Sequence, residues 1–444
     1  MELLKNYNPH WESGKMQIDL VARPHYTAEM SSLMDRKEIV VLKGIRRAGK
    51  SSLIKLFIQK LLNDGVPPQN ICYINLEDYR LGSERDVNTL ENVVQSYQNF
   101  KKPENQVFLF LDEIQEIKHF EKWLRTIYDT NANYKLVITG SSSSLLSGEF
   151  STLLTGRHIA LEIFPFTFAE VLAYRNPDLL TRIESETIDS AYLSELFGDL
   201  EPYLHAFLYE GGFPEAVKHA QQQVNAALLQ QYFDDILFRD VAARYSIRKI
   251  PALQKLALYL VSNMANEFSS RRMANLLAIH RETIIDLIGY LKQVYLVFTT
   301  SNFSFSLNER LNTRKPKKVY CIDNGLFSAL KQTETPDMGK RVENLVFLHL
   351  RTNWQEEIFY WKGKVEIDFV LGNGFPVNVT AQDELEEREI NGLLYYMTQF
   401  NQPRGLLISW NHFTEIEEND RKILVLPLWL FLLKSRQEIM ALLK

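Results

Sequence analysis

One eight-residue stretch constrains the fold of this chain more than any other. Residues 44–51 read Gly-Ile-Arg-Arg-Ala-Gly-Lys-Ser and match the phosphate-binding pattern G-x-x-x-x-G-K-[ST] in full. An apolar run at residues 38–42 leads into the stretch, and a helical pattern at residues 51–62 follows it. In that context the backbone N–H groups of the loop turn toward an anion, and the helix N-terminus adds positive potential. The sequence therefore predicts a site for the phosphates of a nucleotide.

The residues of this loop have distinct expected roles. Lys50 would reach the β- and γ-phosphates of ATP, and the Ser51 hydroxyl would ligate Mg²⁺. The two glycines allow the backbone to curl around the phosphates. For the two arginines, contact with phosphate and pairing with acidic side chains both stay open. The expected nucleotide-binding set is Gly44, Arg46, Arg47, Ala48, Gly49, Lys50, Ser51 and Ser52.

A second stretch, residues 107–113, reads Val-Phe-Leu-Phe-Leu-Asp-Glu. Ionised groups at the end of a buried strand need partners or a metal ion. Asp112 is therefore expected to hold Mg²⁺, and Glu113 to polarise the attacking water as a general base. The alternative is a surface turn that carries two acids. Together with the loop, this pair predicts an enzyme that hydrolyses ATP with Mg²⁺ as its cofactor.

Two further candidates follow along the chain. The apolar run at residues 135–139 ends in Thr139, Gly140 and a serine cluster. The hydroxyl at the tip of this strand, which is expected beside the strand that ends in Asp112, would orient water near the γ-phosphate, unless the segment is a capped loop that starts a helix. Arg157 is expected to project as a finger into the site of a neighbouring subunit, which implies a homo-oligomer. The alternative for Arg157 is an exposed surface arginine.

The spacing of the apolar runs predicts an α/β fold with a parallel sheet. Short runs that are apolar on both faces are typical of buried parallel strands, and they lie at residues 38–42, 71–76, 107–111, 135–139 and 159–163. Helical patterns separate the first four runs, at residues 51–62, 87–99 and 120–129. Four modules are expected, namely an ATPase core at 1–167, a helical lid at 168–246, a winged helix-turn-helix at 247–310 and an α/β domain at 311–444.

Composition and the ends of the chain exclude other classes of protein. A hydrophobic share of 45% excludes a disordered chain, and a net charge of −5 does not indicate a globally basic nucleic-acid binder. The two cysteines, Cys72 and Cys321, are too few for a disulfide framework and are expected to be small buried side chains. No signal peptide is visible, and the longest apolar run, residues 423–433, is too short to span a bilayer. We expect a cytoplasmic protein without a membrane partner.

These motifs resemble those of the bacterial and archaeal AAA-type ATPases, in the branch that carries a C-terminal domain of unknown function. The similarity includes Gly156-Arg157, Phe-Pro-Phe-Thr-Phe at residues 164–168 and Gly-Gly-Phe-Pro at residues 211–214. It implies a P-loop NTPase core whose ATP hydrolysis drives movement of the other domains. Many AAA-type ATPases carry a sensing arginine after the lid proline. Glu215 stands there in this sequence, so Arg239 or Arg244 would have to replace it.

The resemblance also implies that the C-terminal module is similar to restriction endonucleases. Such a nuclease needs a glutamate on a helix, an aspartate at a strand end and Glu-x-Lys on the next strand, to hold Mg²⁺ and position water. This sequence offers Glu343 and Asp368, but Asn378 and Thr380 stand where the second glutamate and the lysine are required. We expect a degenerate, inactive nuclease in which the two remaining acids are structural.

The expected winged helix makes DNA a candidate partner. Two helices framed by residues 269–273 and 280–283, and a basic run at residues 314–318, would meet phosphates through Arg271, Arg272 and Arg281. The alternatives are packing against the nucleotide domain and solvated surface charge. The sequence thus leaves three functions: an ATPase that moves its domains, a slow nucleotide-gated switch with an unknown protein partner, and a DNA-associated ATPase with an inactive nuclease.

Overall fold

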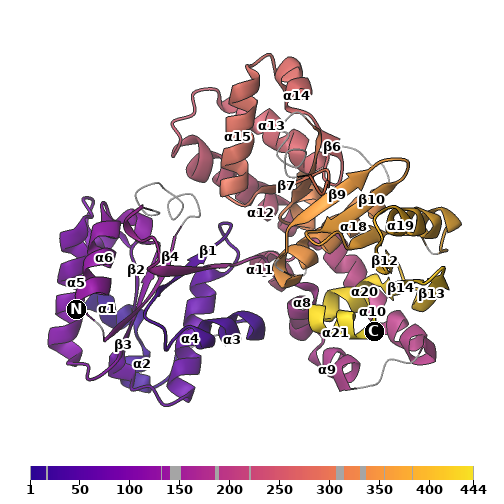
Figure 1. Cartoon of the computed structure of the whole chain (residues 1–444). Helices are drawn as coiled ribbons and strands as arrows, with labels where there is room; N and C mark the ends of the chain where they lie inside the picture. The colour runs from indigo at the N-terminus through magenta and orange to yellow at the C-terminus, as the bar shows by residue number, and fades with distance from the viewer. Residues whose placement is uncertain are drawn as a thin grey trace. The chain divides into compact units, whose positions relative to one another are not determined.

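The structure is a computed structural model that describes residues 2–16, 19–131, 133–140, 152–185, 190–219, 222–306, 315–330, 337–354, 356–382 and 384–443. The chain forms two compact units, Met1–Phe164 and Pro165–Lys444, shown in Figure 1. Within these ranges, none of the helices combines the length and the apolar character that crossing a bilayer requires. The serine cluster that follows Gly140, and Arg314 of the basic run, lie outside the described residues.

The first unit contains a five-stranded sheet in the order β2-β3-β4-β1-β5 (Figure 1). All of its strand pairs are parallel. Each strand agrees with its predicted run to within one residue at either end, which confirms the α/β fold with a parallel sheet. The strands are β1 (Ile39–Lys43), β2 (Ile71–Asn75), β3 (Val107–Asp112), β4 (Tyr134–Thr139) and β5 (His158–Glu162).

The helices of the first unit confirm the predicted alternation of strand and helix. The helix α6 shows why, since its buried residues Phe120, Leu124 and Ile127 recur at helical spacing and join the core of the unit. Three helices follow β1, β2 and β3, namely α4 (Lys50–Asn63), α5 (Val87–Lys101) and α6 (Phe120–Thr130), with 3₁₀ turns η1 (Pro68–Asn70), η2 (Tyr79–Leu81) and η3 (Ile114–Glu116). Three more precede β1: α1 (Glu2–Tyr7), α2 (His10–Ser13) and α3 (Pro24–Ser32).

The second unit begins with a helical half. Its helices are α8 (Phe168–Arg175), α9 (Pro177–Ser185), α10 (Ser190–Glu210), α11 (Pro214–Lys218), α12 (Gln222–Asp235), the π-helical η4 (Ile236–Ala242), α13 (Ile250–Ser262), α14 (Ser270–Leu277) and α15 (Arg281–Gln293). An antiparallel sheet in the order β6-β8-β7 accompanies the last three: β6 (Glu267–Phe268), β7 (Val297–Ser301) and β8 (Lys317–Cys321). Because β8 pairs with β6 and β7, this sheet includes a strand beyond residue 310, where the sequence analysis ends the third module.

The rest of the second unit is a mixed sheet in the order β13-β14-β12-β11-β10-β9. Its strands are β9 (Ile358–Lys362), β10 (Glu366–Leu371), β11 (Pro376–Val379), β12 (Arg404–Ser409), β13 (Thr414–Glu418) and β14 (Arg421–Pro427). Helical segments accompany it: α17 (Asn324–Leu330), α18 (Met338–His349), η5 (Leu350–Trp354), α19 (Glu387–Gln399), α20 (Leu428–Leu433) and α21 (Arg436–Leu442). The longest apolar run is thus β14 followed by α20, divided at Pro427. As predicted, Cys72 and Cys321 are buried thiols.

Candidate nucleotide site and a buried carboxylate cluster

The loop between β1 and α4 carries the predicted phosphate-binding residues. Arg47 and Gly49 both have left-handed backbone angles, with φ of 70° and 90°, so the chain turns sharply just before α4 begins. A Cβ on Gly44 would lie 2.1 Å from the carbonyl oxygen of Ile163, so the first position of the motif accepts only glycine. At the N-cap, Gly49 has no side-chain oxygen to offer the first N–H groups of α4. The loop thus makes a sharp turn that leads directly into the N-terminus of α4.

The Lys50 side chain is 7% exposed and folds back over its own loop. Its Nζ donates hydrogen bonds to the carbonyl oxygens of Gly44, at 3.1 Å, and Ile45, at 3.0 Å. Ser51 and Ser52 lie in the first turn of α4 and are partly buried. Lys50, expected to contact phosphate, and Ser51, expected to ligate Mg²⁺, therefore share the N-terminus of α4.

Arg23 supports this loop, although the sequence analysis did not single it out. Its buried guanidinium donates to the carbonyl oxygen of Ala48 at 3.1 Å and to that of Phe164 at 2.9 Å. The same group lies 4.5 Å from the centre of the Tyr26 ring. Its partners are up to 141 residues away along the chain, so no local pattern marks Arg23.

Asp112 ends β3 and is fully buried, as its place after an apolar run predicts. Its Oδ2 accepts a hydrogen bond from the Tyr73 hydroxyl at 2.9 Å, and its Oδ1 accepts one from the Thr139 hydroxyl. The Thr139 hydroxyl in turn accepts one from the Glu113 amide at 3.0 Å. Burial, and then the Asp112 charge, raises the pKa of Tyr73 far above its usual range, so this phenol stays protonated. Thr139 therefore links the two acids of the predicted site.

The structure brings most, but not all, of the predicted catalytic residues to one sheet edge. Glu113 lies directly after β3 in a left-handed conformation, and the Gln115 side chain donates a hydrogen bond to its carboxylate. Because β4 lies between β1 and β3, the ends of these three strands meet beside the loop. Arg157 instead contacts Asp129 of its own unit, with 3.2 Å between Nε and Oδ1. Its role as a finger stays a prediction.

The Gly-Gly-Phe-Pro stretch forms a junction within the second unit. The Gly212 carbonyl accepts from the Phe166 amide at 2.7 Å, and the Gly212 amide donates to Asp323 at 2.6 Å. The same buried carboxylate accepts from two amides at the start of α17. Burial raises the pKa of Asp323 to about 6, against the opposing effect of these three N–H groups. A Cβ on Gly212 would lie 2.1 Å from the Phe166 carbonyl oxygen, so tight packing requires glycine there.

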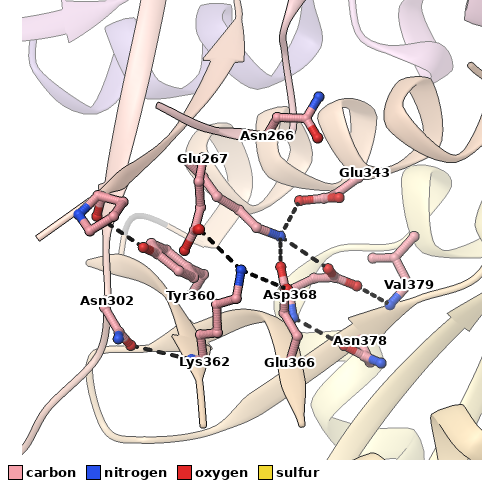
Figure 2. A network of polar contacts seen from close by, with 12 residues as sticks. Asn266, Glu267, Asn302, Glu343, Tyr360, Lys362, Glu366, Asp368, Asn378 and Val379 are labelled. Atoms are coloured by element: carbon pink, nitrogen blue, oxygen red, sulfur yellow. Dashed lines mark hydrogen bonds and ion pairs between the residues drawn. The ribbon is translucent and has the colours of Figure 1, made fainter. Parts of the chain in front are cut away.

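Glu343 of α18 and Asp368 of β10, the two acids expected to be structural, come together around the ammonium of Lys318 (Figure 2). The Nζ of Lys318 lies 3.0 Å from Glu343, 3.3 Å from Asp368 and 2.9 Å from Glu366. In the sequence, Lys318 belongs to the basic run at residues 314–318, which is a candidate to meet DNA. Its side chain is 4% exposed, so this member of the run does not face solvent. Asn378 binds within the cluster, where its side-chain oxygen accepts from the Asp368 amide at 3.0 Å.

The charges of this cluster depend on one another. Burial opposes a charge on Lys318, but Asp368 and Glu343 outweigh it and raise the pKa of the lysine above its usual range. Burial, and then the charge of Asp368, raises the pKa of Glu343, whereas Lys318 lowers it. Burial also raises the pKa of Asp368. Across the part of the chain that the structure describes, no group of three His, Cys, Asp or Glu residues is arranged to hold a metal ion.

Comparison with known proteins agrees with the geometry of the first unit. A family model described as an AAA domain matches residues 36–172, and a model of a domain of unknown function matches residues 201–337. The residues that line the predicted site fall within the first match, so this part of the chain carries an AAA domain.

Two relatives cover both units. An uncharacterised protein of Methanocaldococcus jannaschii is 34% identical over 380 residues, which are 83% of this chain and 77% of that protein. The chain belongs to the family of this archaeal protein. An uncharacterised protein of Haemophilus influenzae is 26% identical over 426 residues, covering 94% of this chain and 100% of the relative. Among solved structures, a Walker-type ATPase of Pyrococcus abyssi aligns with a TM-score of 0.45 and 16% identity, over 71% of this chain and 97% of the other.

Proposed function

We propose that this protein binds ATP with Mg²⁺ at the loop of residues 44–51 and hydrolyses its terminal phosphoanhydride bond. The observation that carries the proposal is the Thr139 hydroxyl, which is bonded to both the Asp112 carboxylate and the Glu113 amide. This contact supports a site in which the Mg²⁺ ligand and the general base are held in a fixed relation.

Each residue of the site has a distinct role in the proposed hydrolysis. Lys50 exchanges its bonds to loop carbonyls for bonds to phosphate oxygens, and Ser51 with Asp112 holds the cation. The donor set fits Mg²⁺, since each Asp112 oxygen accepts one hydrogen bond from a hydroxyl and keeps a lone pair for a ligand. Bound Mg²⁺ offsets the phosphate charge that develops during transfer. Glu113 accepts the proton of the attacking water.

Two measurements test this proposal. We expect Lys50→Ala to weaken binding of a fluorescent ATP analogue at least tenfold in the presence of Mg²⁺, while Lys60→Ala on the exposed face of α4 leaves it unchanged. We expect Glu113→Gln to bind the analogue as the wild type does and to lose steady-state hydrolysis. Wild-type affinity in Lys50→Ala would contradict the binding site, and wild-type turnover in Glu113→Gln would contradict the assigned base.

One contact favours a second candidate, the slow nucleotide-gated switch. The Gln115 side chain engages the Glu113 carboxylate, which is the group that must meet water. If this contact limits turnover, Gln115→Ala should hydrolyse ATP faster than the wild type with unchanged affinity for the analogue. An unchanged or lower rate would leave the faster, domain-moving ATPase as the proposed function.

For the DNA-associated alternative, exposed arginines at the start of α14 are the supporting observation. Arg271 and Arg272 are both exposed, whereas Arg281 is partly buried and donates to the Ser270 hydroxyl at 3.2 Å. Phosphate contacts are strongest at low salt. Stimulation of ATP hydrolysis by duplex DNA at low salt, lost in the Arg271→Ala/Arg272→Ala variant, would support this alternative, and no binding under those conditions would exclude it.

A further inference from the structure

We propose that the Lys318 ammonium is the resident cation of the carboxylate cluster in the second unit and takes the place that a divalent metal ion would occupy there. The cluster is then a permanent electrostatic junction that fastens β8 to α18 and β10. A divalent-cation site would appear only when this lysine is removed. The proposal concerns a site separate from the nucleotide loop.

The cluster is assembled from three elements, each of which supplies groups at regular spacing. Glu366 and Asp368 are two residues apart on β10 and therefore lie on the same face of that strand. Lys318 and Tyr320 are likewise two residues apart on β8. The Tyr320 hydroxyl donates to Glu343 of α18 at 2.8 Å. The three carboxylates thus converge on one point, and the lysine nitrogen lies at that point.

The number of hydrogen-bond donors on the Lys318 ammonium equals the number of carboxylates around it. A lysine has three donors, and the Lys318 Nζ lies 2.9 to 3.3 Å from an oxygen of each of three carboxylates. The Oδ2 of Asp368, which is not the oxygen that contacts Lys318, accepts a hydrogen bond from the Val379 amide at 3.0 Å. This bond fixes the orientation of the carboxylate. Because the ammonium is buried and the side chains of Glu343 and Asp368 are only 14% and 17% exposed, separating them would leave poorly solvated charge without a partner.

The same oxygens are the ligands that hard divalent cations prefer, at about 2.1 Å for Mg²⁺. The distances to Nζ are about 1 Å longer, as hydrogen bonds require. Without the ammonium, the three acids would repel one another unless another cation joined them, and a small contraction around that cation would bring their oxygens to metal-binding distance. A tethered lysine and a divalent cation therefore compete for one position.

A neighbouring lysine offers a matched control. Lys362 of β9 is 49% exposed, and its Nζ lies 3.0 Å from Glu267 and 3.7 Å from Glu366. It pairs with one acid of the cluster but is bonded to neither Glu343 nor Asp368 in the described contacts. Its replacement removes the same charge without emptying the central position.

The test measures Mn²⁺ binding to the nucleotide-free, full-length protein by electron paramagnetic resonance. We expect Lys318→Met to gain one Mn²⁺ site at least tenfold tighter than any that the wild type shows, and to lose it in Lys318→Met/Asp368→Asn. Lys362→Met should bind as the wild type does. We further expect added Mn²⁺ to raise the thermal unfolding midpoint of Lys318→Met and to leave that of the wild type unchanged.

Two results would overturn the proposal. One is a wild-type Mn²⁺ site that Asp368→Asn removes, because the lysine and the metal would then bind together. The other is a folded Lys318→Met protein, judged by circular dichroism, that binds Mn²⁺ no better than the wild type. If Lys318→Met does not fold, Lys318→Gln keeps a polar group in place and is compared in the same way, and the wild-type measurement stands on its own.

Discussion

At acidic pH, protonation of His10 should destabilise the packing of the N-terminal helices against the first sheet. His10 of α2 is fully buried, and its Nε2 lies 3.2 Å from the carbonyl oxygen of Ile71 in β2. Its Nδ1 is also buried and has no hydrogen-bond partner among the described residues. Burial lowers the pKa of His10 to about 4, and nearby Lys101 adds to the effect, while the bond to Ile71 opposes it. The folded protein therefore holds this ring neutral.

The size of the effect follows from the difference between the two pKa values. The unfolded histidine, with its ordinary pKa of 6.5, binds a proton that the folded one takes up only near pH 4. The stabilising contribution is therefore complete above about pH 6.5 and is lost as the pH falls toward 4. At about 1.4 kcal/mol per pH unit, the loss reaches about 2 kcal/mol at pH 5 and about 3 kcal/mol at pH 4.

Native-state hydrogen exchange of α1, α2 and β2, corrected for the intrinsic effect of pH, measures this opening free energy. His10→Gln provides the comparison, because glutamine can donate to the Ile71 carbonyl and does not titrate. We expect the wild type to lose about 2 kcal/mol more than His10→Gln between pH 7 and pH 5. Parallel losses in the two proteins, or a His10 pKa near 6.5 measured by nuclear magnetic resonance, would refute the reasoning.

Two further substitutions follow from single contacts. Gly212→Ala should destabilise the second unit by about 3 kcal/mol, because its Cβ would lie 2.1 Å from the Phe166 carbonyl oxygen. Gly339→Ala on α18 is the control, because a Cβ there meets open space and should be neutral or stabilising. Thermal unfolding of both variants measures the difference, and equal unfolding midpoints would contradict the prediction. Tyr73→Phe removes one of the two hydroxyls that orient Asp112, and we expect the Mg²⁺ concentration for half-maximal ATP hydrolysis to rise about tenfold with little change in maximal rate. A purely structural role for Tyr73 would leave that Mg²⁺ dependence unchanged.

The sequence alone predicted those strands and turns whose conformation is set by residues close together in the chain. The loop at residues 44–51, the buried strand that ends in Asp112 and the strand that ends in Thr139 are each continuous stretches. Their side-chain pattern therefore reports their conformation, and the five strands agree with prediction to within one residue. The adjacency of the Asp112 and Thr139 strands was also expected and is confirmed by their parallel pairing.

Only the tertiary structure decided what the side chains outside these stretches do. Arg23, Tyr73 and His10 act on groups between 25 and 141 residues away, and no periodicity in the sequence marks such pairs. The sequence predicts that the Gly-Gly-Phe-Pro stretch belongs to a helical lid, and the structure adds that its glycines are required by the backbone of Phe166 and by the carboxylate of Asp323.

Lys318 shows most clearly what the sequence alone could not predict. In the sequence it belongs to a basic run, which is usually solvated, and its carboxylate partners follow 25 to 50 residues later. Whether such a lysine faces water or an acid cluster depends on how β8 packs against α18 and β10, and that packing is a property of the folded chain. The local pattern thus predicts where a nucleotide would bind, while long-range packing decided which charges are buried together. Burial changes the energy of a charge far more than any neighbour in the sequence does.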